Sequence, residues 1–176
     1  MAFRDNELIQ TLHALEGNPK WSILTEPLWS IPNSLFAPFA TLYMRQLGLD
    51  DLQIGWILSV GMALQVVFAF ISGVITDKLG RRWATVIFDT FSWTLPCLVW
   101  AFAQNFTWFL AAAILNAMFQ ITNNSWTCLF VEDCPPQYVV NAFTLIQITG
   151  MLSVFISPLA VWLVGRYSLV PVMRGL

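Results

Sequence analysis

A short run of glycines and charged residues carries the clearest chemistry in this sequence. Residues 73–82 read GVITDKLGRR and fit the pattern G-x-x-x-D-(R/K)-x-G-R-(R/K) at each defined position. Gly80 favours a tight reversal of the chain, because glycine adopts backbone conformations that other residues avoid. Gly73 lacks a side chain and would let a neighbouring helix approach closely. Asp77 can cap the start of the next helix, where a carboxylate accepts hydrogen bonds from free N–H groups.

The three cations of this run, Lys78, Arg81 and Arg82, predict contact with anionic lipid headgroups or with carboxylates. Glu132 and Asp133 are the expected carboxylate partners, because they close a later apolar stretch of the chain. A guanidinium can bind a carboxylate through two parallel hydrogen bonds, which fixes geometry as well as energy. An ordinary basic loop is the alternative, but it does not require the two glycines and the aspartate.

A second pattern consists of uncharged polar residues on one helix face. Asn116, Gln120, Asn124 and Thr127 recur at positions i, i+4, i+8 and i+11. The stripe has two open interpretations, hydrogen bonding between packed helices and the wall of a solute cavity. Further candidates for the cavity wall are three amides and one possible aromatic platform: Asn33, Gln65, Gln147 and Trp126.

Asp89 is the one charge well inside an apolar stretch, and placing it there costs at least about 2.5–3.5 kcal/mol. It is therefore expected to be a buried acid, either paired structurally or able to carry a proton. Enzymatic chemistry is not indicated, because Glu132, Asp133 and Cys134 form no nucleophile–base set. The three cysteines lack metal-ligand spacing, so no catalytic residue, metal or cofactor is predicted.

These residues must be positioned by elements that lie in lipid. The chain has 176 residues, of which 57% are hydrophobic and 10% are charged. An average soluble domain has roughly 25% charged residues, so a soluble globular fold is excluded and the bilayer is the main partner. A net charge of −2 also excludes the basic field that nucleic-acid binding needs.

The positions of the charges predict an all-α polytopic membrane protein. Residues 1–26 form a leader with a short amphipathic helix at 5–16, for which Asp5 is a possible N-cap. Residues 27–176 form a transmembrane bundle, with the start of a sixth span at 171. The five predicted spans lie at about 27–46, 53–76, 83–104, 107–131 and 141–165.

Orientation follows from the basic residues near the ends of the spans. With the N-terminus in the cytoplasm, five Lys and Arg residues lie inside and three lie outside. Three of the five lie in the short loop at 78–82, which is hard to translocate. We expect a protein of the cytoplasmic membrane with a cytoplasmic N-terminus.

The run at 73–82, placed between the second and third spans, resembles the signature loop of the major facilitator superfamily. The resemblance implies an incomplete N-terminal six-helix bundle, truncated at the start of the sixth helix. It also implies that Gly73, Asp77, Lys78, Gly80, Arg81 and Arg82 control conformational change rather than bind substrate.

By this resemblance the chain is the N-terminal portion of a secondary transporter, which moves a small solute by alternating access. Two bundles must move about a shared site, so the expected partner is the missing C-terminal half or a second copy. The fragment alone is not expected to transport. The alternative function is a non-transporting module, truncated or half-length, that assembles with a partner.

Overall fold

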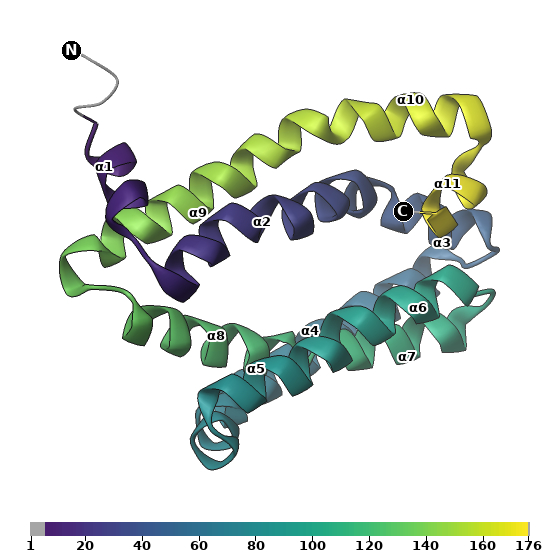
Figure 1. Cartoon of the computed structure of the whole chain (residues 1–176). Coiled ribbons are helices and arrows are strands. Elements are labelled where there is room, and N and C mark those ends of the chain that lie inside the picture. Colours follow the sequence, from purple (N-terminus) through teal and green to yellow (C-terminus); the bar gives the residue numbers. More distant parts are fainter. Residues whose placement is uncertain (1–5, 176) are drawn as a thin grey trace. The chain divides into compact units, whose positions relative to one another are not determined.

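The computed structural model describes residues 6–175, and within that range the regular structure is entirely helical (Figure 1). The helices form two compact units. One contains the described residues up to Pro38 together with Phe130–Ser168, and the other contains Phe39–Leu129 and Leu169–Gly175. The predicted all-helical fold is confirmed.

The first unit begins with a short helix, α1 (Glu7–Ala14). The Asn6 side chain caps it by accepting a hydrogen bond from the Leu8 N–H at 2.9 Å. Asp5, the cap expected from the sequence, lies outside the described residues. Thr11 of α1 is buried, and its hydroxyl accepts a hydrogen bond from the Asn141 side chain at 3.1 Å. This bond fixes the leader helix to the start of α9 (Val139–Ser153).

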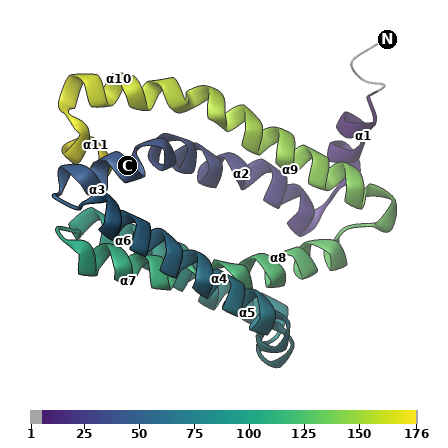
Figure 2. The same cartoon turned by 180° about the vertical axis from the view of Figure 1, so that it is seen from behind.

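Two longer helical segments make up the rest of this unit. Helix α2 (Gly17–Phe36) continues through the 3-10 turn η2 (Ala37–Phe39). Helix α9 follows the turn η4 (Pro136–Tyr138) and continues through η5 (Val154–Ile156) into α10 (Ser157–Tyr167). Helices α2 and α9 lie side by side in both views (Figures 1 and 2).

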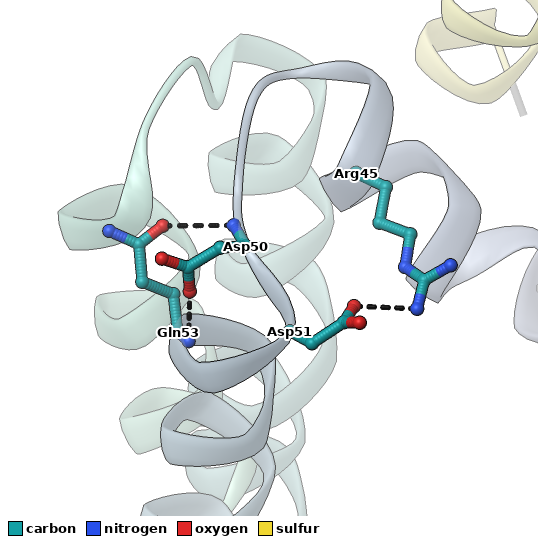
Figure 3. Close-up of polar contacts among 4 residues, drawn as sticks. All are labelled: Arg45, Asp50, Asp51 and Gln53. Carbon is teal, nitrogen blue, oxygen red and sulfur yellow. Dashed lines mark hydrogen bonds and ion pairs between the residues drawn. The ribbon is translucent and has the colours of Figure 1, made fainter.

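The second unit starts with α3 (Ala40–Gln46) and α4 (Asp51–Leu79). The start of α4 is held by a reciprocal capping box, in which Asp50 and Gln53 each accept a hydrogen bond from the other's backbone N–H (Figure 3). Arg45 of α3 pairs with Asp51 at 2.5 Å across the same loop. The turn between the first two predicted spans is thus fixed by polar contacts at both sides.

The remaining helices of the second unit follow α4 in chain order. Helix α5 (Arg81–Asp89) passes through a π-helical turn, η3 (Thr90–Thr94), into α6 (Leu95–Phe102). Helix α7 (Phe106–Asn116) is followed by a turn and then by α8 (Phe119–Asp133), whose last four residues belong to the first unit. Helix α11 (Leu169–Gly175) returns to this unit and contacts α3 and α6.

Three helical segments among the described residues are long and apolar enough to cross a membrane: Asp51–Leu79, Arg81–Phe102 and Pro136–Tyr167. They contain or overlap the spans predicted at 53–76, 83–104 and 141–165. The spans predicted at 27–46 and 107–131 fall on helical segments with interruptions, at η2 in one and at residues 117–118 in the other. The helix at the first of them begins at Gly17, ten residues before the predicted start.

Aromatic packing holds the end of the second unit together. The rings of Tyr43 and Phe109 are fully buried, and their centroids lie 5.9 Å apart in an edge-to-face arrangement. Trp100 stacks on Tyr43 at 6.0 Å and meets Phe109 at 4.8 Å. The Tyr43 hydroxyl donates a hydrogen bond to the Trp100 carbonyl at 3.1 Å and accepts one from Arg174 Nε at 3.4 Å. Helices α3, α6, α7 and α11 are joined by this cluster.

Candidate functional site

The turn between α4 and α5 depends on Gly80. Its φ of +80° lies in the region that favours glycine, so the predicted tight reversal is present. Gly80 itself occupies the N-cap position of α5, and no side chain donates or accepts a cap hydrogen bond there. The expectation that Asp77 caps this helix is therefore wrong. Asp77 and Lys78 lie in the last turn of α4 and are exposed.

The close approach expected at Gly73 is found elsewhere on the same helix. A Cβ atom added at Gly73 would meet nothing within 4 Å. At Gly61 it would lie 3.6 Å from the Ala113 Cβ and 3.9 Å from the Ala113 carbonyl oxygen. Gly61 lies twelve residues before Gly73, which is about 18 Å along the helix axis at a rise of 1.5 Å per residue. Helix α4 therefore makes its close contact with α7 at Gly61 and not at the motif glycine. Among residues 6–175 no neighbouring helix approaches Gly73 closely, so the close approach expected there is not found within this chain.

The expected charge partners are divided between the units. Arg81 and Arg82 lie at the start of α5 in the second unit, whereas Glu132 and Asp133 belong to the first. The Asp133 carboxylate accepts a hydrogen bond from the Asn18 side chain at 2.6 Å. Pairing of the loop arginines with these carboxylates stays a prediction.

The amide stripe of the fourth predicted span makes hydrogen bonds between helices. Gln120 Nε2 donates to Gln65 Oε1 of α4 at 3.4 Å. Asn124 Nδ2 donates to the Thr76 hydroxyl of α4 at 3.2 Å. All four of these residues belong to the second unit.

Two further contacts extend this pattern toward α5 and η3. Asn116 Nδ2 donates to the Ser92 carbonyl at 2.8 Å. The Thr85 hydroxyl of α5 donates to the Ser125 hydroxyl of α8 at 2.9 Å. We call the set of groups that form these four contacts the polar seam: Gln65, Thr76, Thr85, Ser92, Asn116, Gln120, Asn124 and Ser125.

The polar seam favours the first of the two interpretations of the stripe. Within a bilayer an uncompensated polar group is costly, and each amide of the seam reaches a partner on another helix. The hydroxyl and carbonyl partners were not identified from the sequence, because serine and threonine side chains are common in apolar helices. Thr127 and Trp126 lie on α8 close to the seam and are half-buried.

The remaining sequence candidates occupy other surfaces. Asn33 is half-buried on α2 and Gln147 is exposed on α9, both in the first unit. Asp89, the last residue of α5, is exposed. The side chain of Asp89 is therefore not enclosed by the described helices, and its burial within the membrane stays a prediction.

Sequence reasoning missed a polar contact between α2 and α9 in the first unit. The hydroxyls of Ser30 and Ser153 are 2.7 Å apart, and both side chains are buried. One helical turn away, a Cβ at Gly150 would lie 3.7 Å from Glu26 Oε1. Small residues on both helices would have been the available signal for this close packing.

Metal chemistry finds no support in residues 6–175, where no three His, Cys, Asp or Glu side chains are grouped to hold an ion. Cys134 lies between α8 and η4, outside the long helices. Burial raises the pKa of the Cys134 thiol, which keeps it protonated and a poor metal ligand.

The family of the chain follows from a match along most of its length. The profile of the Major Facilitator Superfamily matches residues 29–173. The chain belongs to the major facilitator superfamily. This membership agrees with the signature pattern at 73–82 and confirms a polytopic membrane protein of a transporter family, not an enzyme.

One curated relative of this superfamily chain is the nitrate/nitrite transporter NrtP of Picosynechococcus sp. (strain ATCC 27264 / PCC 7002 / PR-6). The two are 35% identical over 80 residues. The aligned stretch covers 46% of this chain and 15% of that protein. No solved structure matches the chain.

The contact at Gly61 gives a prediction for this superfamily member. Both Gly61→Leu and Gly73→Leu raise helix propensity by the same amount, but only the first places a side chain against Ala113 of α7. We expect Gly61→Leu to lower the stability of the folded chain by about 1–3 kcal/mol and Gly73→Leu to leave it unchanged or higher. Thermal unfolding in the same detergent measures both, and equal losses would contradict the assigned helix contact.

Proposed function

We propose that this chain supplies the N-terminal helices of a secondary transporter that moves a small solute by alternating access. The observation that carries the proposal is the family match over residues 29–173, together with the complete loop pattern at 73–82. The reversal at Gly80 and the exposed Asp77, Lys78 and Arg82 support a loop that is free to exchange charge partners. We place the protein in the cytoplasmic membrane with the N-terminus and this loop on the cytoplasmic side.

Transport requires a second helical bundle in this proposal. Alternating access in this superfamily uses two bundles that rock about a site between them. The part of the chain aligned to the nitrate/nitrite transporter NrtP covers only 15% of that protein. We propose a C-terminal half, or a second copy of the chain, as the partner, and we propose that the chain alone does not transport.

The proposed solute is small and polar, and the named relative makes nitrate and nitrite the first probes. No Lys or Arg occurs between Arg45 and Lys78 or between Arg82 and Arg166. Recognition by this chain therefore depends on uncharged donors, such as amide N–H groups, and not on a cation inside a span. Because the seam amides are paired between helices, the first proposed solute contacts of the second unit are the half-buried Trp126 and Thr127 of α8. Asn33 and Gln147 stay separate candidates in the first unit.

The test of this function reconstitutes the chain with and without its partner. The full reading frame that contains residues 1–176 is expressed, purified and placed in liposomes beside the 176-residue chain alone. We expect uptake of a small polar solute, with nitrate and nitrite tested first and neutral sugars next, only with both bundles present. Properly inserted protein that moves none of these solutes would favour the alternative, a non-transporting module that assembles with a partner.

The loop charges give a second prediction for the same full-length protein. Arg81→Ala and Asp77→Asn are expected to slow transport several-fold, because an ion pair at a partly wet interface contributes up to about 1 kcal/mol to the balance between two states. Membrane insertion and expression should stay normal. Lys20→Ala removes a cation outside the loop and serves as the matched control. Unchanged rates in both loop variants would show that the motif acts only in topology.

A further inference from the structure

The third predicted span contains a local break in its helical pattern. At η3 the Leu95 N–H bonds to the Thr90 carbonyl, five residues back, so the helix is under-wound there. Pro96 follows and has no N–H, and it therefore cannot donate to the Ser92 carbonyl four residues before it. The backbone of this span leaves one carbonyl without its usual partner.

The side chain of Asn116 supplies the missing donor from the neighbouring span. Its Nδ2 atom lies 2.8 Å from the Ser92 carbonyl oxygen. Asn116 is the last residue of α7, so the donor lies at the point where the fourth span is itself interrupted. Asn116 of the fourth span thus donates to the carbonyl for which Pro96 of the third span has no N–H.

The interruption in the fourth span is of the opposite kind. The Met118 N–H bonds to the Leu115 carbonyl at 3.1 Å, and the Ile121 N–H bonds to the Met118 carbonyl at 2.9 Å. Both bonds reach back three residues, so the helix is over-wound at this point. The rings of Trp93 and Phe119 meet edge to face at 5.4 Å and join the two irregular segments a second time.

We propose that the π turn of the third span and the break in the fourth span form one joint, in which Asn116 is a positioning residue that makes the two spans bend together. Kinks in helices arise where the regular hydrogen-bond ladder is broken, and here two broken ladders share one hydrogen bond. The joint is a property of the second unit alone. A role of the joint in a transport cycle rests on the proposed function, whereas the coupled bending of the third and fourth spans does not rest on it.

Two buried hydroxyls beside the joint favour movement over a single fixed geometry. Among the described residues, Ser92 Oγ and Thr122 Oγ1 are buried and have no hydrogen-bond partner. Such groups are uncommon because an unpaired buried hydroxyl destabilises the state that contains it. A change of bend angle that brought either hydroxyl to a carbonyl oxygen would gain a hydrogen bond that the observed geometry lacks.

The experiment alters the fourth span and measures the shape of the third. Spin labels at Trp83 and Phe102, both exposed ends of the third span, report its bend as a distance distribution in the full chain in nanodiscs, with the native cysteines replaced. Asn116→Leu removes the donor and is expected to broaden this distribution and shift its centre. Asn123→Leu changes an exposed amide of the same helical segment and should leave the distribution unchanged.

Pro96→Ala provides the decisive comparison, because it restores a backbone N–H for the Ser92 carbonyl. We expect this variant to narrow the distribution and to remove most of the effect of Asn116→Leu in the double variant. The joint would be overturned if Asn116→Leu changed the distance distribution equally with Pro96 and with Pro96→Ala. It would also be overturned if Pro96→Ala alone left the distribution unchanged. Bending as predicted in a protein that transports nothing would contradict the proposed function and leave the joint intact.

Discussion

The need to satisfy polar groups without water governs this structure. In a bilayer the backbone of each helix pairs internally, but side-chain amides, hydroxyls and any carbonyl freed by proline must find partners on other helices. The polar seam meets this need in the second unit, where each of three amides on the fourth span reaches a group on the second or third span. The serine pair between α2 and α9 meets it in the first unit.

The same constraint explains which expectations from the sequence held. Long uncharged stretches predict helices, and three such helices are present at 51–79, 81–102 and 136–167. The φ of Gly80 agrees with a tight turn because only a few residue types adopt it readily. The spacing of Asn116, Gln120 and Asn124 predicted one polar face, which is what the interhelical bonds require. These features depend on local pattern, and local pattern is visible in the sequence.

Features that depend on the rotation of a helix about its axis were not predictable in this way. Asp89 and Gly73 lie at the expected positions along their helices, but the side chain of Asp89 is exposed and no described residue lies within 4 Å of a Cβ added at Gly73. Gly61, without a motif around it, makes the close helix contact instead. The partners of the three amides on the fourth span are one amide, one hydroxyl and one backbone carbonyl, and the last two types do not stand out in an apolar sequence. Pro96 has no N–H for the Ser92 carbonyl and Asn116 donates to that carbonyl instead, a relation that became visible only from the hydrogen bonds.

These arrangements connect the family to the proposed mechanism. A transporter of the major facilitator type needs helices that stay bound to one another while the bundle as a whole moves. Hydrogen bonds between the second, third and fourth spans hold that group together, and Asp77, Lys78 and Arg82 of the loop are exposed. The first candidates for solute contact are Trp126 and Thr127, which are half-buried on α8 close to the seam.

The central claim is that the seam amides bind helices to one another, and the pair Asn124 and Thr76 tests it most directly. A double-mutant cycle with Asn124→Ala, Thr76→Val and both together, followed by reversible unfolding in detergent, gives the interaction energy between the two side chains. The account predicts a coupling of about 0.6 kcal/mol, the average for hydrogen bonds between membrane helices, and at most about 1.7 kcal/mol. Strictly additive losses would show that the two side chains do not bind each other, and would contradict the account.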